Sequence, residues 1–389
     1  MKTLKNKKRK ILFVSERRAD YSRLKPIMKA VNKSQKLEMQ LLVTGMHLLK
    51  YFGETKKVVK DDGFRIDAIL PVFAKNDQDD GANMVRGMSR ALAGMPGIFT
   101  KLNPDIVFTG FDIGCNFAAA ITAMHLNIHV AHIQGGEVSG TIDEVIRHGL
   151  TKFAHIHFAA TKQSVERIIK MGEDPKYVFN VGCPSLDTMK SIEYFSKEEI
   201  FKKYGLDKNK NLIVFSQHPV TSEVDQVEEQ ITTSMNALKE AIKKYNAQAI
   251  AIYSNNDAGG KRIVEQLKKS GIMIFAHIVN EDYFRLLKVA NVLVGNSSTG
   301  IHEAPSLKLP AVNIGTREQL RERGFNVIDV DYNKDEIVKA IKKAIFDKEF
   351  IKKVQECRNP YDNGRETTRQ VVRILEDIDL PSIQKVITY

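Results

Sequence analysis

The chain has 389 residues, a length that suits two domains, and its 43% hydrophobic and 27% charged residues are typical of a soluble globular protein. No apolar run approaches the roughly 20 residues that cross a bilayer, and the basic segment at residues 1–10 lacks the apolar core of a secretory signal. The net charge of +12 comes from lysines spread along the chain without interleaved aromatic residues, so it favours an anionic small molecule over nucleic acid.

The three cysteines, Cys115, Cys183 and Cys357, are odd in number and far apart in the sequence. This spacing argues against a disulfide framework and against a metal site, and it fits packing residues in a reducing compartment. We therefore expect a cytoplasmic protein that binds no membrane, no nucleic acid and no metal.

Short apolar strands alternate with helices along the first half of the chain, which predicts a parallel sheet that binds ligands at the carboxyl ends of its strands. We expect strands at residues 11–16, 39–45, 66–72, 105–112, 128–133, 155–161 and 178–186. We expect helices at residues 17–31, 50–60, 82–101, 115–126 and 162–171, and one that begins near Thr141.

Charged and polar side chains follow several of these strands. Arg18 and, further along the same helix, Arg23 come after the first strand, where the free N–H groups of a helix start can face a phosphate. A capped surface helix explains this segment equally well. His47 follows the second strand and Asp112 closes the fourth, so both are placed to reach the same crevice.

The stretch from residue 132 to 152 concentrates ionisable groups directly after a Gly-Gly break. It contains Glu137, and an i to i+4 spacing places Asp143 and Arg147 on one face of the following helix. A capped helix with a surface ion pair would explain one such pair. The density of charged groups after a strand favours a functional site.

The second half repeats the alternation, so we predict an α/β protein with two Rossmann-like, doubly wound domains that face a cleft, a GT-B-type arrangement. Strands are expected at residues 212–217, 248–254, 272–278, 291–295, 310–314 and 326–330. The predicted divisions are residues 1–186, 187–365 and a C-terminal helix within 366–389.

Loops after the second set of strands supply further candidates. His218 lies in a loop made rigid by Pro219, and a loop histidine without function is the alternative. Hydroxyl groups and free N–H groups at a helix start are suited to a diphosphate, and an acidic residue nearby is suited to ribose hydroxyls. The candidate nucleotide contacts are Asn255, Ser297, Ser298, Thr299, Gly300 and Glu303.

Several motifs together carry a family resemblance over residues 11 to 370. They are RADY at residues 18–21, HIQGGE at 132–137, TIDEVIRH at 141–148, HPVT at 218–221 and NSSTGIHE at 296–303. With these motifs the sequence resembles the UDP-N-acetylglucosamine 2-epimerases, most closely the hydrolysing branch that serves the synthesis of sialic-acid-type sugars.

The resemblance implies that residues 1–186 form the sugar-binding and catalytic side, that residues 187–365 bind the nucleotide, and that the helix within 366–389 returns to the first domain. It also implies a role for each matching residue. Asp112, Asp143 and His218 are the expected acids and bases, Arg147 would hold a carboxylate, and Arg18 would approach the diphosphate. His47 and Arg321 match loops beside the substrate. Two departures matter: Phe111 and Ile113 flank Asp112 where many relatives have Gly-Asp-Arg, and Gln134 replaces a glutamate that is catalytic in several relatives.

An amide cannot act as a base, so either Glu137 takes that role or Asp112 and Asp143 suffice. The expected reaction is deprotonation at C2 of UDP-N-acetylglucosamine, elimination of UDP and hydration of the resulting glycal to N-acetylmannosamine. It needs no cofactor, and the resemblance implies a homodimer. The alternatives are the same reaction on UDP- or GDP-diacetylbacillosamine, a non-hydrolysing 2-epimerase, a GT-B glycosyltransferase and a nucleotide-sugar-binding protein without activity.

Overall fold

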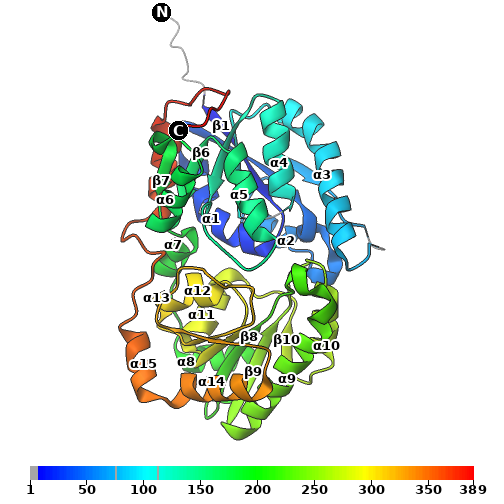
Figure 1. The fold of residues 1–389 in the computed structure, drawn as a ribbon, viewed down its shortest axis with the longest axis vertical. Helices are drawn as coiled ribbons and strands as arrows, with labels where there is room; N and C mark the ends of the chain where they lie inside the picture. The colour runs from blue at the N-terminus through cyan, green and yellow to red at the C-terminus, as the bar shows by residue number, and fades with distance from the viewer. Residues whose placement is uncertain (1–7, 75–76, 112–113) are drawn as a thin grey trace, which may run out of the picture.

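Two parallel β-sheets form two lobes, one above the other in Figure 1. The computed structural model describes residues 8–74, 77–111 and 114–389. The first sheet has seven strands in the order β3-β2-β1-β4-β5-β6-β7, and the second has six in the order β10-β9-β8-β11-β12-β13. Within the described residues, no helix is long and apolar enough to cross a membrane.

The first lobe contains the elements of the first half of the chain. Its strands are β1 (Arg9–Ser15), β2 (Leu37–Thr44), β3 (Ala68–Leu70), β4 (Ile106–Gly110), β5 (His129–Ile133), β6 (Ile156–Ala159) and β7 (Val178–Asn180). Its helices are α1 (Arg18–Lys33), α2 (Lys56–Asp61), α3 (Gly81–Leu102), α4 (Gly114–His125), α5 (Asp143–Phe153) and α6 (Lys162–Lys170), with short 3-10 turns η1 (Gly45–Leu48), η2 (Lys50–Phe52) and η3 (Pro175–Tyr177).

The second lobe follows after two connecting helices, α7 (Pro184–Ser191) and α8 (Lys197–Tyr204). Its strands are β8 (Asn211–Ser216), β9 (Ala247–Ile252), β10 (Met273–Phe275), β11 (Val292–Gly295), β12 (Ala311–Ile314) and β13 (Val327–Val330). Its helical segments are η4 (Thr221–Gln226), α9 (Val227–Lys244), α10 (Gly260–Lys268), α11 (Asn280–Val289), α12 (Thr299–His302), α13 (Ala304–Leu307), α14 (Lys334–Phe346) and α15 (Lys348–Gln355).

Helices cover both faces of each sheet, which explains why the strands read as continuous apolar runs. Along β1, Ile11 and Phe13 pack into the core beside α1, whereas Leu12 and Val14 pack into the core beside α3 and α4. Successive side chains of a strand point to opposite faces, so a strand buried on both faces needs apolar residues at every position. The predicted α/β class with two doubly wound sheets is confirmed.

The strand order reverses direction between β1 and β4 in the first sheet and between β8 and β11 in the second. A crevice opens at the carboxyl ends of the strands at such a switch point. The loops after β1, β5, β8 and β11 therefore lie where the two lobes meet. These loops, together with the helices that they lead into, contain most of the predicted site residues.

The chain returns to the first lobe at its C-terminal end. Helix α16 (Thr367–Asp377) packs against α1, and its Val371 and Leu375 belong to the core of the first sheet. In Figure 1 this red segment and the C-terminus lie beside β1, far from the second lobe. The first lobe is therefore built from both ends of the described chain.

Several predicted boundaries were wrong in detail. The helix expected at residues 50–60 is broken at Gly53, whose φ of 95° is a left-handed conformation that stops η2 before α2 begins. Helix α5 begins at Asp143, two residues after the predicted start near Thr141, and the Thr141 hydroxyl accepts a hydrogen bond from the Asp143 N–H. The predicted division after residue 186 lies within α7, the first connecting helix, and the domain bounds stay a prediction.

Candidate active site

A cavity of about 220 Å³ lies between the lobes and is lined by loops from both sheets. Of the predicted residues, Asp112 lies outside the described part of the chain, and Gly300 packs against Ala311 instead of lining the cavity. The other predicted residues all line it: Arg18, Arg23, His47, Glu137, Asp143, Arg147, His218, Asn255, Ser297, Ser298, Thr299, Glu303 and Arg321. Their chemical roles stay predictions.

Arg18 reaches across the cleft from the start of α1. Its guanidinium donates to the carbonyl oxygens of Ala276, Tyr253 and Ser254 in the second lobe, the last two at 3.3 Å. Burial lowers the pKa of Arg18 to about 10. The hydrogen bonds of this cation to the described residues thus go to neutral carbonyl groups, and an anion entering the cavity would neutralise its charge.

Two further arginines of the same segment bind the second lobe. Arg17 forms an ion pair with Asp257 at 3.2 Å. Arg23 donates to Nδ1 of His302 at 2.8 Å and lies 3.4 Å from a carboxylate oxygen of Glu303. The start of α1 therefore brings three cations to the cleft, of which Arg17 was not predicted.

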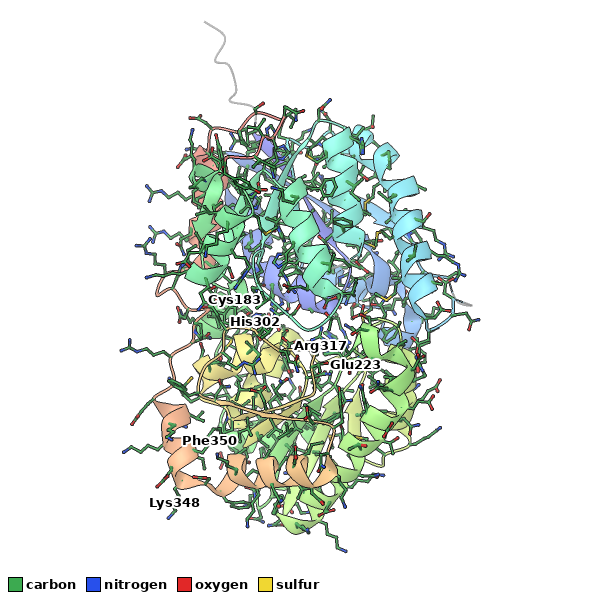
Figure 2. All side chains as sticks on the ribbon, in the orientation of Figure 1. Cys183, Glu223, His302, Arg317, Lys348 and Phe350 are labelled. Atoms are coloured by element: carbon green, nitrogen blue, oxygen red, sulfur yellow. The ribbon has the colours of Figure 1, made fainter. Side chains whose placement is uncertain are left out.

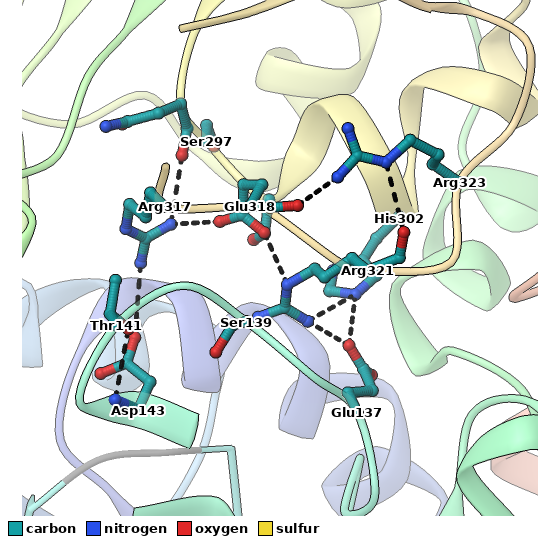
Figure 3. Close-up of polar contacts among 12 residues, drawn as sticks. Glu137, Ser139, Thr141, Asp143, Ser297, His302, Arg317, Glu318, Arg321 and Arg323 are labelled. Atoms are coloured by element: carbon teal, nitrogen blue, oxygen red, sulfur yellow. Dashed lines mark hydrogen bonds and ion pairs between the residues drawn. The ribbon is translucent and has the colours of Figure 1, made fainter. Parts of the chain in front are cut away.

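Glu137 is the centre of a buried network that joins the lobes (Figure 3). Its carboxylate accepts from Nε2 of His302 at 2.9 Å and from Arg321, both in the second lobe, and from the Gln134 amide at 3.0 Å. Burial alone would raise the pKa of Glu137, but His302 and Arg321 hold it well below its usual range. Glu137 is therefore an ionised, fully engaged carboxylate, which makes it a poor candidate for a free base.

The tautomer of His302 follows from its two neighbours. Arg23 can only donate, so Nδ1 of His302 accepts, and the ring proton sits on Nε2 and faces the Glu137 carboxylate. Figure 2 shows His302 and Arg317 at the level where the lobes meet. His302, which belongs to the second lobe, thus links Arg23 and Glu137 of the first lobe.

Arg147 is almost fully buried and holds the loop that contains Glu137. It donates to the Glu137 carbonyl oxygen at 2.9 Å and to the Ser139 hydroxyl at 3.1 Å, and it pairs with Glu144 at 3.2 Å. Asp143 lies 3.7 Å from Arg317 of the second lobe. Arg147 is thus buried and holds a loop, and Asp143 reaches the other lobe, so the alternative of a surface ion pair on this helix does not describe the two residues.

His218 stands opposite α5 in the cavity wall. Its Nδ1 accepts the backbone N–H of Asn255 at 3.1 Å, so the neutral ring carries its proton on Nε2. Burial, with the nearby charges of Arg317 and Arg18, holds the pKa of His218 well below its usual range. A neutral imidazole with a proton on Nε2 is suited to donate a hydrogen bond to a substrate oxygen.

His47 has partners on both ring nitrogens. It lies 2.9 Å from the Ser15 hydroxyl and 2.8 Å from the Thr55 hydroxyl, and Ser15 in turn donates to Asp20. These bonds fix the loop after β2 at the cavity wall. A role of His47 in substrate binding stays a prediction.

The loop after β11 presents Ser297, Ser298 and Thr299 to the cavity. Helix α12, which follows, has only four residues, so its dipole is small and the predicted help from a helix start is weaker than the sequence indicated. Glu303 accepts from Ser185 through one oxygen at 2.7 Å, while its other oxygen has no hydrogen-bond partner among the residues that the structure describes. That oxygen is free to accept from a ligand hydroxyl.

The charged and imidazole side chains that line the cavity without a role assigned from the sequence include Arg17, His277 and His302. Arg17 and His302 adjoin predicted residues, so proximity was the available signal. His277 follows β10, and burial lowers its pKa to about 4. No group of three or more His, Cys, Asp or Glu side chains within the described ranges is arranged to hold a metal ion.

Comparison with known proteins identifies the family. The family model described as UDP-N-acetylglucosamine 2-epimerase matches residues 29–376. A UDP-N,N'-diacetylbacillosamine 2-epimerase (hydrolyzing) of Legionella pneumophila is 36% identical over 96% of this chain and 97% of the relative. A UDP-N-acetylglucosamine 2-epimerase of Neisseria meningitidis is 33% identical over 96% of each chain.

Among solved structures, a UDP-GlcNAc 2-epimerase from Neisseria meningitidis bound to UDP-GlcNAc has a TM-score of 0.78 at 18% identity, covering 95% of this chain and 100% of that one. A likeness at this identity shows the fold, and it confirms the predicted GT-B-type pair of Rossmann-like lobes. Because the family model and both relatives span nearly the whole sequence, the chain belongs to the UDP-N-acetylglucosamine 2-epimerase family.

Proposed function

We propose that this protein is a hydrolysing 2-epimerase, which converts a UDP-linked 2-acetamido sugar to the free 2-epimer and UDP. The observation that carries the proposal is one cavity lined by Arg18, the hydroxyl-rich loop after β11, Asp143 and His218. Among the described residues, Arg18 is hydrogen-bonded only to neutral carbonyl groups. A cation without a carboxylate partner suits a diphosphate, and the acid and base groups suit chemistry on the attached sugar.

The reaction needs two steps. A carboxylate takes the C2 proton, the C1–O bond breaks, and its electron pair leaves with the diphosphate, giving a glycal. Water then adds at C1 while a proton is delivered to C2 from the opposite face. Asp143 and Asp112 are the proposed acid and base carboxylates, because Glu137 is bound by His302 and Arg321.

The remaining groups assist these steps. Arg18 stabilises the negative charge that develops on the leaving diphosphate. His218, with its proton on Nε2, donates to the departing oxygen or to the sugar. Arg147 keeps the loop of Glu137 and Ser139 in place beside the sugar.

For the sugar we propose UDP-N,N'-diacetylbacillosamine ahead of UDP-N-acetylglucosamine, which the sequence alone favoured. Phe111 lines the cavity and stacks against Arg23, whose guanidinium carbon lies 5.6 Å from the ring centre. An apolar wall suits a sugar that carries a methyl group at C5 in place of a hydroxymethyl group. The Legionella relative supports the same choice, and the Neisseria relative supports UDP-N-acetylglucosamine as the second candidate.

The test is proton NMR of the purified protein in D₂O with each UDP-sugar in turn. We expect free 2-epimer that carries deuterium at C2, with UDP accumulating, and a higher kcat/KM for the diacetamido sugar. A UDP-linked 2-epimer at equilibrium would instead identify a non-hydrolysing epimerase. Release of UDP without deuterium at C2 would contradict an epimerase and indicate simple hydrolysis or transfer.

A further inference from the structure

Helix α5 carries site residues at one end and is held by the C-terminal segment at the other. Asp143 and Arg147, in its first half, line the cavity. At its opposite end the Lys385 ammonium donates to the carbonyl oxygens of Lys152 at 3.0 Å and Thr151 at 3.4 Å, and to that of Ala154. The last carbonyls of a helix have no hydrogen-bond partner within the helix, and they form the negative end of the helix dipole. A cation at this end supplies the missing hydrogen bonds and neutralises the negative charge.

Lys385 is itself fixed by a buried carboxylate. Its ammonium lies 2.5 Å from Glu173, which also pairs with Lys152 at 2.6 Å and with Nε2 of His157 at 3.1 Å. Burial alone would raise the pKa of Glu173, but His157 and the two lysines lower it to about 2. Glu173 is therefore charged at neutral pH and keeps Lys385 against the end of α5.

The backbone around Lys385 is bound along its length. The carbonyl oxygen of Pro381 accepts from Nε2 of His129 at 2.9 Å, and that of Ile383 accepts from Nε2 of His155 at 3.1 Å. The N–H of Thr388 donates to the Gly172 carbonyl oxygen at 3.3 Å. Because His129 opens β5 and His155 directly precedes β6, this segment lies at the amino ends of the strands, on the opposite side of the sheet from the cavity.

Helix α5 connects these two sides. It has 11 residues and is about 16 Å long. The Thr151 hydroxyl donates to the Arg147 carbonyl oxygen at 3.1 Å, and the Arg147 guanidinium binds Glu137 and Ser139. A helix is stiff over this length, so a shift at its C-terminal end moves Asp143 and the loop that Arg147 holds.

We propose that Lys385 is a positioning residue for the proposed reaction. By binding the carbonyl end of α5 it sets the axial position of that helix, and thereby the placement of Asp143 and Arg147 in the cavity. The inference rests on the proposed function for its kinetic consequence, although the placement of the helix is measurable by itself.

The test compares Lys385→Met with a matched control, Arg9→Met. Arg9 donates to the carbonyl oxygens of Leu375 and Ile378 at the end of α16, so it makes the same kind of contact with a helix that does not line the cavity. We expect Lys385→Met to lower kcat at least tenfold with KM within twofold, because the nucleotide is proposed to bind the other lobe. Lys385→Arg restores at least half of the activity, and Arg9→Met changes kcat less than twofold.

Thermal unfolding of each variant distinguishes a loss of kcat caused by displacement of α5 from one caused by a general loss of stability. Equal losses of kcat in Lys385→Met and Arg9→Met at equal loss of thermal stability would overturn the proposal, as would an unchanged kcat in Lys385→Met. If Lys385→Met is not recovered folded, Lys385→Gln, which keeps a polar group of similar length, replaces it.

Amide hydrogen exchange provides a readout that does not need turnover. We expect Lys385→Met to increase exchange over residues 145–150 of α5, while α16 is unchanged, and Arg9→Met to do the reverse. If the wild type turns over neither UDP-sugar, the proposed function fails, and the exchange data alone then decide on the position of α5. Unchanged exchange in α5 would overturn the proposal in that case.

Discussion

At the scale of single residues, Arg18 has opposite effects on binding and on stability. Its charge is buried against carbonyl groups, which disfavours the folded state, and the same charge is available to a diphosphate. We expect Arg18→Met to weaken UDP binding by about 10- to 100-fold, the loss of one charged hydrogen-bonding group, without lowering the melting temperature. Calorimetric titration with UDP and thermal unfolding measure the two effects.

Arg65→Met is the control for Arg18, because Arg65 is an exposed arginine of the same lobe whose partner is Asp67. We expect Arg65→Met to leave the affinity for UDP unchanged. A normal UDP affinity in Arg18→Met would place the diphosphate elsewhere and remove the main support for the proposed site.

His218 gives a second prediction at this scale. Replacing it by Gln exchanges the imidazole for an amide, which can donate a hydrogen bond but cannot transfer a proton, and we expect kcat to fall about 10²- to 10⁴-fold, as is typical for loss of a general acid or base. His125→Gln, at an exposed site on α4, serves as the control and keeps full activity. Equal activity of both variants would show that His218 takes no part in the chemistry.

The low pKa of His218 also predicts how stability depends on pH. Below pH about 6.5 the unfolded chain takes up a proton at this histidine that the folded chain does not, so the free energy of unfolding falls as the pH is lowered. His218→Gln should reduce this slope by up to about 1.4 kcal/mol per pH unit. Urea unfolding between pH 7 and pH 5 measures it, and an identical slope in the variant would contradict the buried, neutral state.

At the scale of elements, the break between β5 and α5 depends on Gly136. Its φ is +76°, and a Cβ there would lie 2.4 Å from the Ser164 carbonyl oxygen. Gly364 has the same φ of +76° and nothing within 4 Å of its Cβ position. We expect Gly364→Ala to lower the free energy of unfolding by only about 1–2 kcal/mol, the cost of a left-handed conformation, and Gly136→Ala to lower it further because backbone must move. Urea unfolding compares the two, and equal losses would mean that the loop adapts freely.

The elements were largely predictable because strands buried on both faces read as apolar runs, as in Ile11 to Val14. The positions of the loops followed from the strand–helix alternation, so the residues after β1, β5, β8 and β11 could be assigned to one site. The break at Gly53 was missed, because one glycine inside a helical pattern does not by itself reveal a left-handed conformation.

The partners within the site could not be predicted in the same way. Arg17 with Asp257, and Glu137 with His302 and Arg321, are pairs between lobes, and no sequence spacing encodes how two lobes meet. These contacts depend on the relative position of the sheets, which the sequence pattern leaves open. Hence the residue types of the site were recognised, whereas the engagement of Glu137 became apparent only from the fold.

At the scale of the whole molecule, buried charge pairs hold the lobes together. Lys25 of α1 pairs with Asp62 of its own lobe and with Glu281 of the other, both at 2.7 Å. Removing it leaves both carboxylates without this cation, so we expect Lys25→Met to open the cleft and enlarge the radius of gyration measured by small-angle X-ray scattering. Lys36→Met, which breaks an exposed pair with Asp377 inside one lobe, is the control. If both variants scatter like the wild type, Lys25 does not hold the lobes together.

The return of α16 to the first lobe has a consequence for biosynthesis. During translation the ribosome completes the entire second sheet, through β13 and α14, before it makes residues 367–377. The core beside β1 lacks Val371 and Leu375 until then. The lobe that is started first is therefore finished last, and a nascent chain paused before α16 would expose apolar surface on α1, where chaperones bind.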